Sequence, residues 1–113
     1  MPALEQVLKQ KAAEISGNPT KMAKVRDWVD GYRGKILNFK TKGTAYHLVF
    51  TKEGVACRAG EYPSVELTYI GEEDALASLV RGETTTREAA KAGKLKTWHN
   101  LHEAVRFEEV LKT

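Results

Sequence analysis

The sequence has little of several features that would indicate a specialised class of protein. It contains one cysteine, Cys57, and three prolines among 113 residues. A single cysteine excludes an internal disulfide and is typical of a reducing compartment. No apolar run approaches the roughly 20 residues that a membrane-spanning helix needs. Residues 1–5 lack the basic and apolar regions of a signal peptide, and residues 111–113 are not the Ser-Lys-Leu peroxisomal address. We therefore expect a cytoplasmic protein.

Combinations of residues that support catalysis or metal binding are also scarce. The densest cluster contains His99, His102 and Glu103, but its spacing is not the His-Glu-x-x-His of a zinc helix. Cys57 could act as a nucleophile only with a base beside it, and the strand pattern places His47 on the opposite face. The glycines lie at turns and form no phosphate-binding loop. The sequence therefore predicts no catalytic residue, no metal and no cofactor, and we expect a protein that is not an enzyme.

Basic residues only slightly outnumber acidic residues. The chain has 18 basic and 15 acidic residues, a net charge of +3 and an isoelectric point near 9.0. The basic residues are interleaved with acids, as where Lys9 and Lys11 are followed by Glu14. Binders of nucleic acid gather Lys and Arg on one face, so no nucleic acid is expected. Weak attraction to an anionic membrane, or to RNA or DNA, stays open as an alternative.

Helical periodicity recurs along the chain, and turn residues separate the periodic segments. The pattern predicts five helices, which cover residues 4–16, 22–30, 72–81, 86–92 and 100–111. The first three bury apolar residues on one face each, with Trp28 expected in the core. The last is capped by Asn100 and carries one broad apolar stripe: Leu101, Ala104, Val105, Phe107, Val110 and Leu111.

Alternation of polar and apolar residues predicts five strands between these helices. The strands cover residues 35–40, 45–51, 55–59, 64–70 and 94–98. Short turns join the first four, so we expect an antiparallel meander. The expected fold is α+β: a single layer of helices packed on a five-stranded, mostly antiparallel sheet, within one domain that spans residues 1–113.

One face of the predicted sheet is apolar and needs the helices to cover it. Its members are Leu37, Phe39, Tyr46, Leu48, Phe50, Val55, Cys57, Val65, Leu67, Tyr69 and Leu95, followed by Thr97 at its end. These residues could wall an apolar cavity between the helices and the sheet, or pack into a solid core, because the two have the same pattern.

The stretch from Leu76 to the last helix resembles a known family. Leu76, Leu79 and Gly82 form a Leu-x-x-Leu-x-x-Gly segment, which is followed by Ala89, by Gly93–Lys96 and by an amphipathic helix. This order and spacing is similar to the sterol carrier protein type 2 family of lipid-binding domains, and the paired strands upstream resemble it more weakly. The chain departs from the family pattern at residues 97–99, Thr-Trp-His, and at Ala90 and Lys91, where bulky aromatic residues are common.

The resemblance implies that a lipid, such as a fatty acid, a fatty acyl group or a sterol-like molecule, is bound and transferred without catalysis in an apolar cavity. The lipid-binding residues that it implies are Phe39, Leu48, Phe50, Leu67, Tyr69, Leu79, Ala90, Leu95, Thr97, Leu101 and Val105. Candidates for a head group are Thr97, His99 and Tyr69. Transient contact with a membrane is expected, and the chain would be a monomer or a homodimer. The alternatives are a structural or dimerising module with a solid core and no ligand, and an RNA-binding domain.

Overall fold

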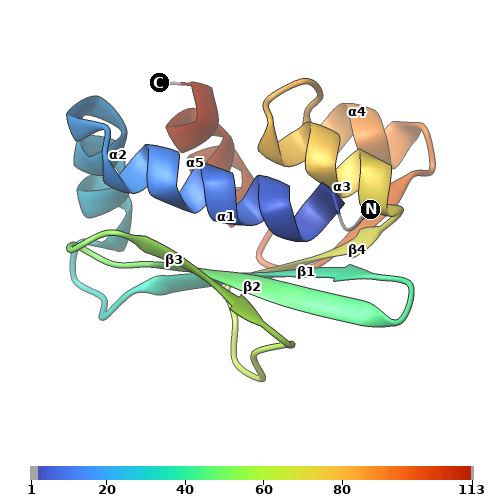
Figure 1. Ribbon diagram of the computed structural model, residues 1–113, viewed down its shortest axis with the longest axis horizontal. Coiled ribbons are helices and arrows are strands. Elements are labelled where there is room, and N and C mark those ends of the chain that lie inside the picture. The colour runs from blue at the N-terminus through green and yellow to red at the C-terminus, as the bar shows by residue number, and fades with distance from the viewer. Residues whose placement is uncertain (1–2, 113) are drawn as a thin grey trace.

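The computed structural model describes residues 3–112, so Met1, Pro2 and Thr113 lie outside the described residues. All the helices in this part of the chain lie on one side of the sheet (Figure 1). In chain order they are α1 (Ala3–Ser16), α2 (Pro19–Val29), α3 (Glu73–Val80), α4 (Thr86–Lys91) and α5 (His102–Lys112). The predicted single layer of helices is therefore confirmed. No helix within residues 3–112 combines the length and the apolar character that crossing a bilayer requires.

The sheet has five strands: β1 (Lys35–Thr41), β2 (Thr44–Phe50), β3 (Val55–Ala59), β4 (Leu67–Gly71) and β5 (Leu95–His99). Their spatial order is β3-β2-β1-β4-β5, and every pair is antiparallel except β1 with β4. The α+β fold with a mostly antiparallel sheet is confirmed. Strands β3 and β5 form its two edges.

The prediction that the first four strands form one antiparallel meander is wrong at β4. Strand β4 begins at Leu67 and pairs in parallel with β1, placing Phe39 opposite Tyr69. Residues 60–66 make this connection by crossing the outer face of the sheet, which is the face that the helices do not cover (Figure 1). Asn38 holds them there, because its side chain donates to the carbonyl of Tyr62 at 2.9 Å and accepts from the Tyr62 N–H at 2.9 Å. Val65, predicted to lie in the strand, lies in this crossing segment.

The core between the helices and the sheet is centred on aromatic rings. The Phe107 ring of α5 lies 6.0 Å from Phe39, 5.7 Å from Phe50 and 6.2 Å from Tyr69, measured between ring centroids. All four side chains are fully buried. Tilted and edge-to-face pairs at these distances stabilise a core beyond the area that they bury. Trp28 packs on Phe50 at 4.9 Å, so its predicted place in the core is confirmed.

A buried ion pair joins α5 to the sheet. Lys35 Nζ in β1 lies 2.6 Å from Glu103 Oε2 in α5, and the Trp28 indole N–H donates to Glu103 Oε1 at 3.1 Å. The Tyr32 ring lies under the Lys35 ammonium at 4.0 Å. Because both carboxylate oxygens are satisfied, the charge is tolerated in the core. The pair fixes where α5 begins on the sheet.

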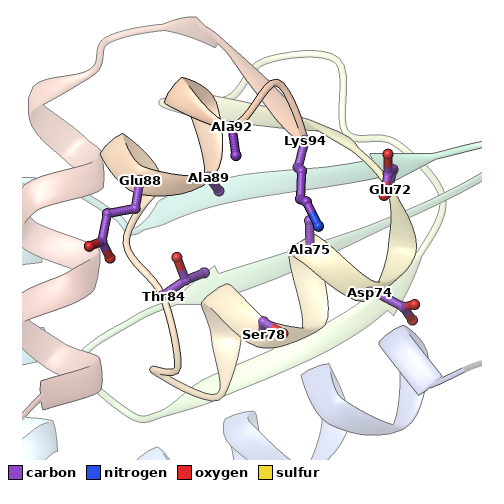
Figure 2. Close-up of a pocket in the computed structure, with 9 residues that line it drawn as sticks. All are labelled: Glu72, Asp74, Ala75, Ser78, Thr84, Glu88, Ala89, Ala92 and Lys94. Atoms are coloured by element: carbon purple, nitrogen blue, oxygen red, sulfur yellow. The ribbon is translucent and has the colours of Figure 1, made fainter.

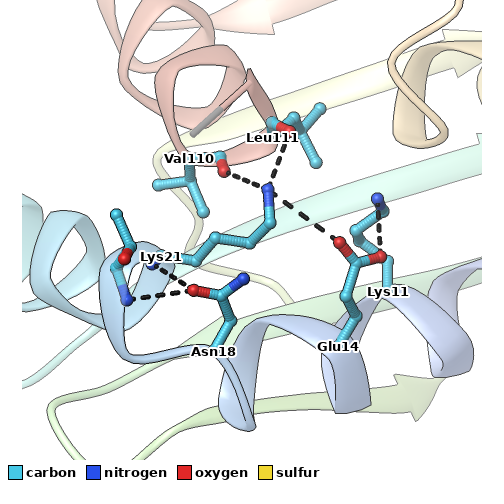
Figure 3. A network of polar contacts seen from close by, with 7 residues as sticks. Lys11, Glu14, Asn18, Lys21, Val110 and Leu111 are labelled. Atoms are coloured by element: carbon cyan, nitrogen blue, oxygen red, sulfur yellow. Dashed lines mark hydrogen bonds and ion pairs between the residues drawn. The ribbon is translucent and has the colours of Figure 1, made fainter.

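A second buried cation fixes where α5 ends. Lys21 in α2 donates to the carbonyls of Val110 at 3.1 Å and Leu111 at 2.9 Å, with Glu14 at 3.9 Å (Figure 3). A cation favours the negative end of a helix dipole and here satisfies carbonyls without helical partners. Burial lowers the pKa of the Lys21 amine. Both ends of α5 are therefore tied to elements early in the chain.

Candidate functional site

An apolar groove lies at the surface between α4, β5 and α5. Its volume is about 490 Å³. The helices supply most of its lining, and Thr97 of β5 lies at its base; the full set is Thr86, Arg87, Ala90, Lys91, Thr97, Leu101, Ala104, Val105 and Glu108. Pockets of roughly 300–1,000 Å³ with apolar walls and a few polar groups are typical of small-ligand sites. The groove has both properties.

The apolar stripe predicted for the last helix is divided between the core and this groove. Ala104, Phe107 and Val110 are buried, whereas Leu101 is 56% exposed and Val105 58% exposed. Leu101 directly precedes α5 and Val105 lies in its first turn, and both exposed side chains line the groove. Large apolar side chains left in water at one place indicate a surface that binds something.

A chain of hydrogen bonds sets the distance between α4 and α5. The Glu108 carboxylate in α5 accepts from the Thr86 N–H in the first turn of α4 at 3.0 Å. The Thr86 hydroxyl in turn lies 3.2 Å from the Tyr69 hydroxyl, which is fully buried beneath the groove. Burial raises the pKa of Tyr69 well above its usual range, so the phenol stays neutral and can keep this bond. The width of the groove is thus linked to the core.

Positive charge lies along the α4 side of the groove. Arg87 and Lys91 are exposed residues of α4 that line it, and none of the ion pairs among residues 3–112 involves them. The Thr97 hydroxyl adds a polar group at the base. An apolar floor with cations on one wall suits an amphiphile with an anionic head group.

The structure brings together only some of the residues that the resemblance implied. Ala90, Thr97, Leu101 and Val105 line the groove. The others belong to the packed core and are at most 4% exposed: Phe39, Leu48, Phe50, Leu67, Tyr69, Leu79 and Leu95. Of the head-group candidates, Thr97 lines the groove and Tyr69 reaches its wall through Thr86, whereas His99 is not part of its lining.

Other lining residues were missed by reasoning from the sequence. Thr86, Arg87 and Lys91 lie in a short helix whose pattern only indicated good helix formers, and Glu108 reads as an ordinary surface acid. Their side chains share a site because α4 packs beside α5 in space. The apolar stripe of α5 is unusually wide, because Val105 directly follows Ala104. This width was the one signal in the sequence that could have indicated a second apolar face.

On its other side, α4 faces a second cleft of a different character. This cleft of about 350 Å³ lies between α3 and α4; the acidic residues Glu72, Asp74 and Glu88 are part of its lining, and the Lys94 side chain extends into it (Figure 2). Ala92 lines this cleft rather than the groove. Its polar lining does not suit an acyl chain. Helix α4 is therefore bordered by open space on both sides.

The histidines and the cysteine do not converge on either cavity. His99 ends β5 with a positive φ of 80°, His102 begins α5, and both are exposed. Glu103 is engaged by Lys35 and Trp28. Cys57 pairs across the sheet with Leu48, while His47 pairs with Arg58, so the two are on opposite faces as predicted. Burial raises the pKa of the Cys57 thiol. Within residues 3–112, no three His, Cys, Asp or Glu residues gather in a way that could hold a metal ion.

Comparison with known proteins identifies the family of this chain. The profile of the SCP-2 sterol transfer family matches residues 4–112. The chain therefore belongs to the SCP-2 sterol transfer family. This membership supports a role in lipid or sterol binding and transfer in general. No protein in a search of curated sequences matches it significantly.

Solved structures with the same fold share few identical residues with this chain. Sterol Carrier Protein 2 from Yarrowia lipolytica in its apo form is 20% identical, with a TM-score of 0.64 over 95% of this chain and 85% of that one. The UbiJ-SCP2 ubiquinone synthesis protein is 19% identical, with a TM-score of 0.67 over 96% and 89%. Palmitated SCP2L2 from Aedes aegypti is 16% identical, with a TM-score of 0.58 over 98% and 93%. At these identities the likeness shows the fold.

Proposed function

We propose that this protein binds a fatty acid, fatty acyl group or similarly apolar lipid in the groove between α4, β5 and α5, and that it does so without catalysis. The observation that carries the proposal is the pair of exposed apolar side chains, Leu101 and Val105, which face Ala90 across about 490 Å³ of open space. A chain lying there would gain about 0.8 kcal/mol for each methylene removed from water.

The polar groups of the groove suit one orientation of such a ligand. The tail would lie along Leu101, Ala104 and Val105, and an anionic or polar head group would meet Arg87, Lys91 or the Thr97 hydroxyl. Charge-assisted hydrogen bonds from Arg or Lys to a carboxylate are stronger than neutral ones. The palmitated state of SCP2L2 from Aedes aegypti, a protein of the same fold, is consistent with this ligand class.

The packed core limits where the ligand can go. Phe107 touches three aromatic rings, and the predicted lipid-binding residues of the sheet are buried against one another. A lipid inserted between the sheet and the helices would have to displace these contacts, at a cost of several kcal/mol. We therefore place the ligand in the surface groove. The predicted residues of the packed core would support the groove from beneath: Phe39, Leu48, Phe50, Leu67, Tyr69, Leu79 and Leu95.

The test is a titration of the purified protein, freed of bound lipid, with a fluorescent long-chain fatty acid. We expect saturable binding at one site, and native mass spectrometry of freshly purified protein should detect a lipid adduct. The dense core favours one alternative, a structural module in which Leu101 and Val105 pair with a second copy. Absence of fatty-acid binding together with a dimer in light scattering would support that alternative and contradict the proposal.

The proposal carries two further expectations: the protein catalyses no reaction, and it is located in the cytoplasm. A neutral Cys57 thiol with His47 on the other face of the sheet is a poor nucleophile. Turnover of a fatty acyl ester by the purified protein, lost in the Cys57→Ser or His102→Ala variant, would contradict the non-catalytic assignment.

A further inference from the structure

The outer face of the sheet is unevenly covered. In the described part of the chain the helices lie on the other side (Figure 1), and the crossing segment 60–66 covers β1 and β2. Its contacts there include the Asn38–Tyr62 hydrogen bonds and the His47 ring, whose Nδ1 lies 2.9 Å from the Gly60 carbonyl oxygen. At the β4–β5 end, by contrast, the Trp98 side chain is 62% exposed.

Trp98 lies within a small surface of distinctive chemistry. We define the β5 corner as Trp98 and Lys96 of β5, Ile70 of β4 and Lys42 of the β1–β2 turn, which line one shallow concavity of about 410 Å³. Ile70 lies opposite Lys96 across the β4–β5 pair. Among the ion pairs within residues 3–112, none uses Lys42 or Lys96. Glu72 and Lys94 line the same concavity. The corner therefore combines an exposed indole, an aliphatic side chain and two lysines outside these ion pairs.

The β5 corner and the groove share strand β5. Side chains alternate along a strand, so Thr97 faces the groove while Lys96 and Trp98 face the corner. Together the two concavities are lined by five cations and two carboxylates, an excess equal to the +3 net charge of the whole chain. Although the basic residues are scattered in sequence, the fold gathers several of them around β5.

We propose that the β5 corner docks on the surface of an anionic bilayer. Tryptophan is enriched at the headgroup level of membranes, where its ring is partly apolar and its N–H finds a partner. Lysines on such a surface are attracted to anionic headgroups, at about 1 kcal/mol each, and their stems cover apolar area. The corner has a single aromatic, whereas single-stranded nucleic acids are bound on several stacked rings. The inference rests on the proposed function and deepens it, since the strand that would meet the bilayer also supplies Thr97 to the groove.

The first test measures the quenching of Trp98 fluorescence by vesicles. They contain about 30% phosphatidylserine, and the rest is phosphatidylcholine, some of it brominated in the acyl chain. The chain has two tryptophans, Trp98 exposed and Trp28 buried. Brominated vesicles should quench the emission of the protein, and the Trp98→Phe variant, which keeps only Trp28, should lose this quenching. Equal quenching in both proteins, or none in either, would overturn the proposal.

The second test measures the charge contribution by vesicle sedimentation. The Lys42→Gln/Lys96→Gln variant should partition onto anionic vesicles about thirtyfold more weakly, because two lysines are removed. The control variant Lys24→Gln/Arg33→Gln loses the same charge at exposed positions on and just after α2, and it should bind nearly as well as the unmodified protein. Pure phosphatidylcholine vesicles, or about 0.5 M salt, should weaken binding of the unmodified protein.

Vesicle binding is measured without a groove ligand, so its outcome is separate from that of the proposed function. The corner variants should keep their affinity for fatty acid. Equal vesicle binding by the corner variant and the control variant would refute docking at this site. Binding to a single-stranded oligonucleotide that is lost in the corner variant, with no vesicle binding by the unmodified protein, would refute it in favour of nucleic acid.

Discussion

Filling the groove at Ala90 is the most informative perturbation of the proposed site. Ala90 lines the groove from α4 and is exposed, so the Ala90→Trp side chain can be accommodated without disturbing the core. The indole would occupy space that we assign to about three to five methylenes of the ligand. At about 0.8 kcal/mol each, binding should weaken by about 2–4 kcal/mol, or about thirty- to a thousandfold. Stability should fall by only about 0.7 kcal/mol or less, the difference in helix propensity.

The assay is a fluorescent fatty-acid titration of the variant beside thermal melts. The matched control is Ala92→Trp, which adds the same ring at the end of the same helix but on the side of the polar cleft (Figure 2). Its affinity should stay within a few-fold of the unmodified protein. Unchanged affinity in a folded Ala90→Trp protein, or an equal loss in both variants, would refute the assignment of the groove as the binding site.

Three further predictions concern the elements that support the groove. Leu95→Ala, at an inward position that is 4% exposed, should lower the free energy of unfolding by about 2–5 kcal/mol in urea melts, and a loss under about 0.5 kcal/mol would be inconsistent with its packing. Glu103→Gln leaves Lys35 buried without its counter-ion and should cost about 3–5 kcal/mol; a loss below about 1 kcal/mol would mean that the pair is solvated. Tyr69 has a raised pKa in the folded state, so the stability that it contributes is complete below its unfolded pKa of about 10 and is lost as pH rises further. Unfolding measured against pH should therefore show a smaller alkaline loss in Tyr69→Phe, and identical profiles would contradict this linkage.

Residues that follow a local periodicity could be assigned from the sequence. Leu37 and Phe39 alternate with polar residues in β1, and the helical spacing of Leu76, Leu79 and Val80 defines the buried face of α3; all are fully buried. Such patterns work because strand and helix geometry fix which side chains share a face. The elements and the inward face of the sheet were predictable for this reason.

The neighbours of each element could not be predicted in the same way. Alternation in residues 64–70 indicates a strand but not its partner. The placement of β4 beside β1 is accompanied by hydrogen bonds between the Asn38 side chain and the backbone of Tyr62, 24 residues away. The pairing of Lys35 with Glu103 likewise spans 68 residues. Contacts between side chains this far apart leave no periodic signal.

The site was only partly predictable because its wall is formed by an apolar face that remains uncovered. Hydrophobicity placed Val105 and Phe107 in one stripe, although Phe107 enters the core and Val105 is 58% exposed. Which of the two is covered depends on how α4 lies beside α5, and the Thr86–Glu108 hydrogen bond holds that arrangement. Exposure of an apolar side chain is a property of the assembled fold.

The most direct test of the central claim is a chemical-shift titration of the isotopically labelled protein with a long-chain fatty acid. If the ligand lies in the groove, the largest shifts should occur at Ala90, Thr97, Leu101 and Val105, which line it. Shifts in the packed sheet residues, such as Leu48, should be small, because the core does not open. Large shifts in the core with little change in α4 and α5, or no shifts at all at saturating fatty acid, would contradict the account.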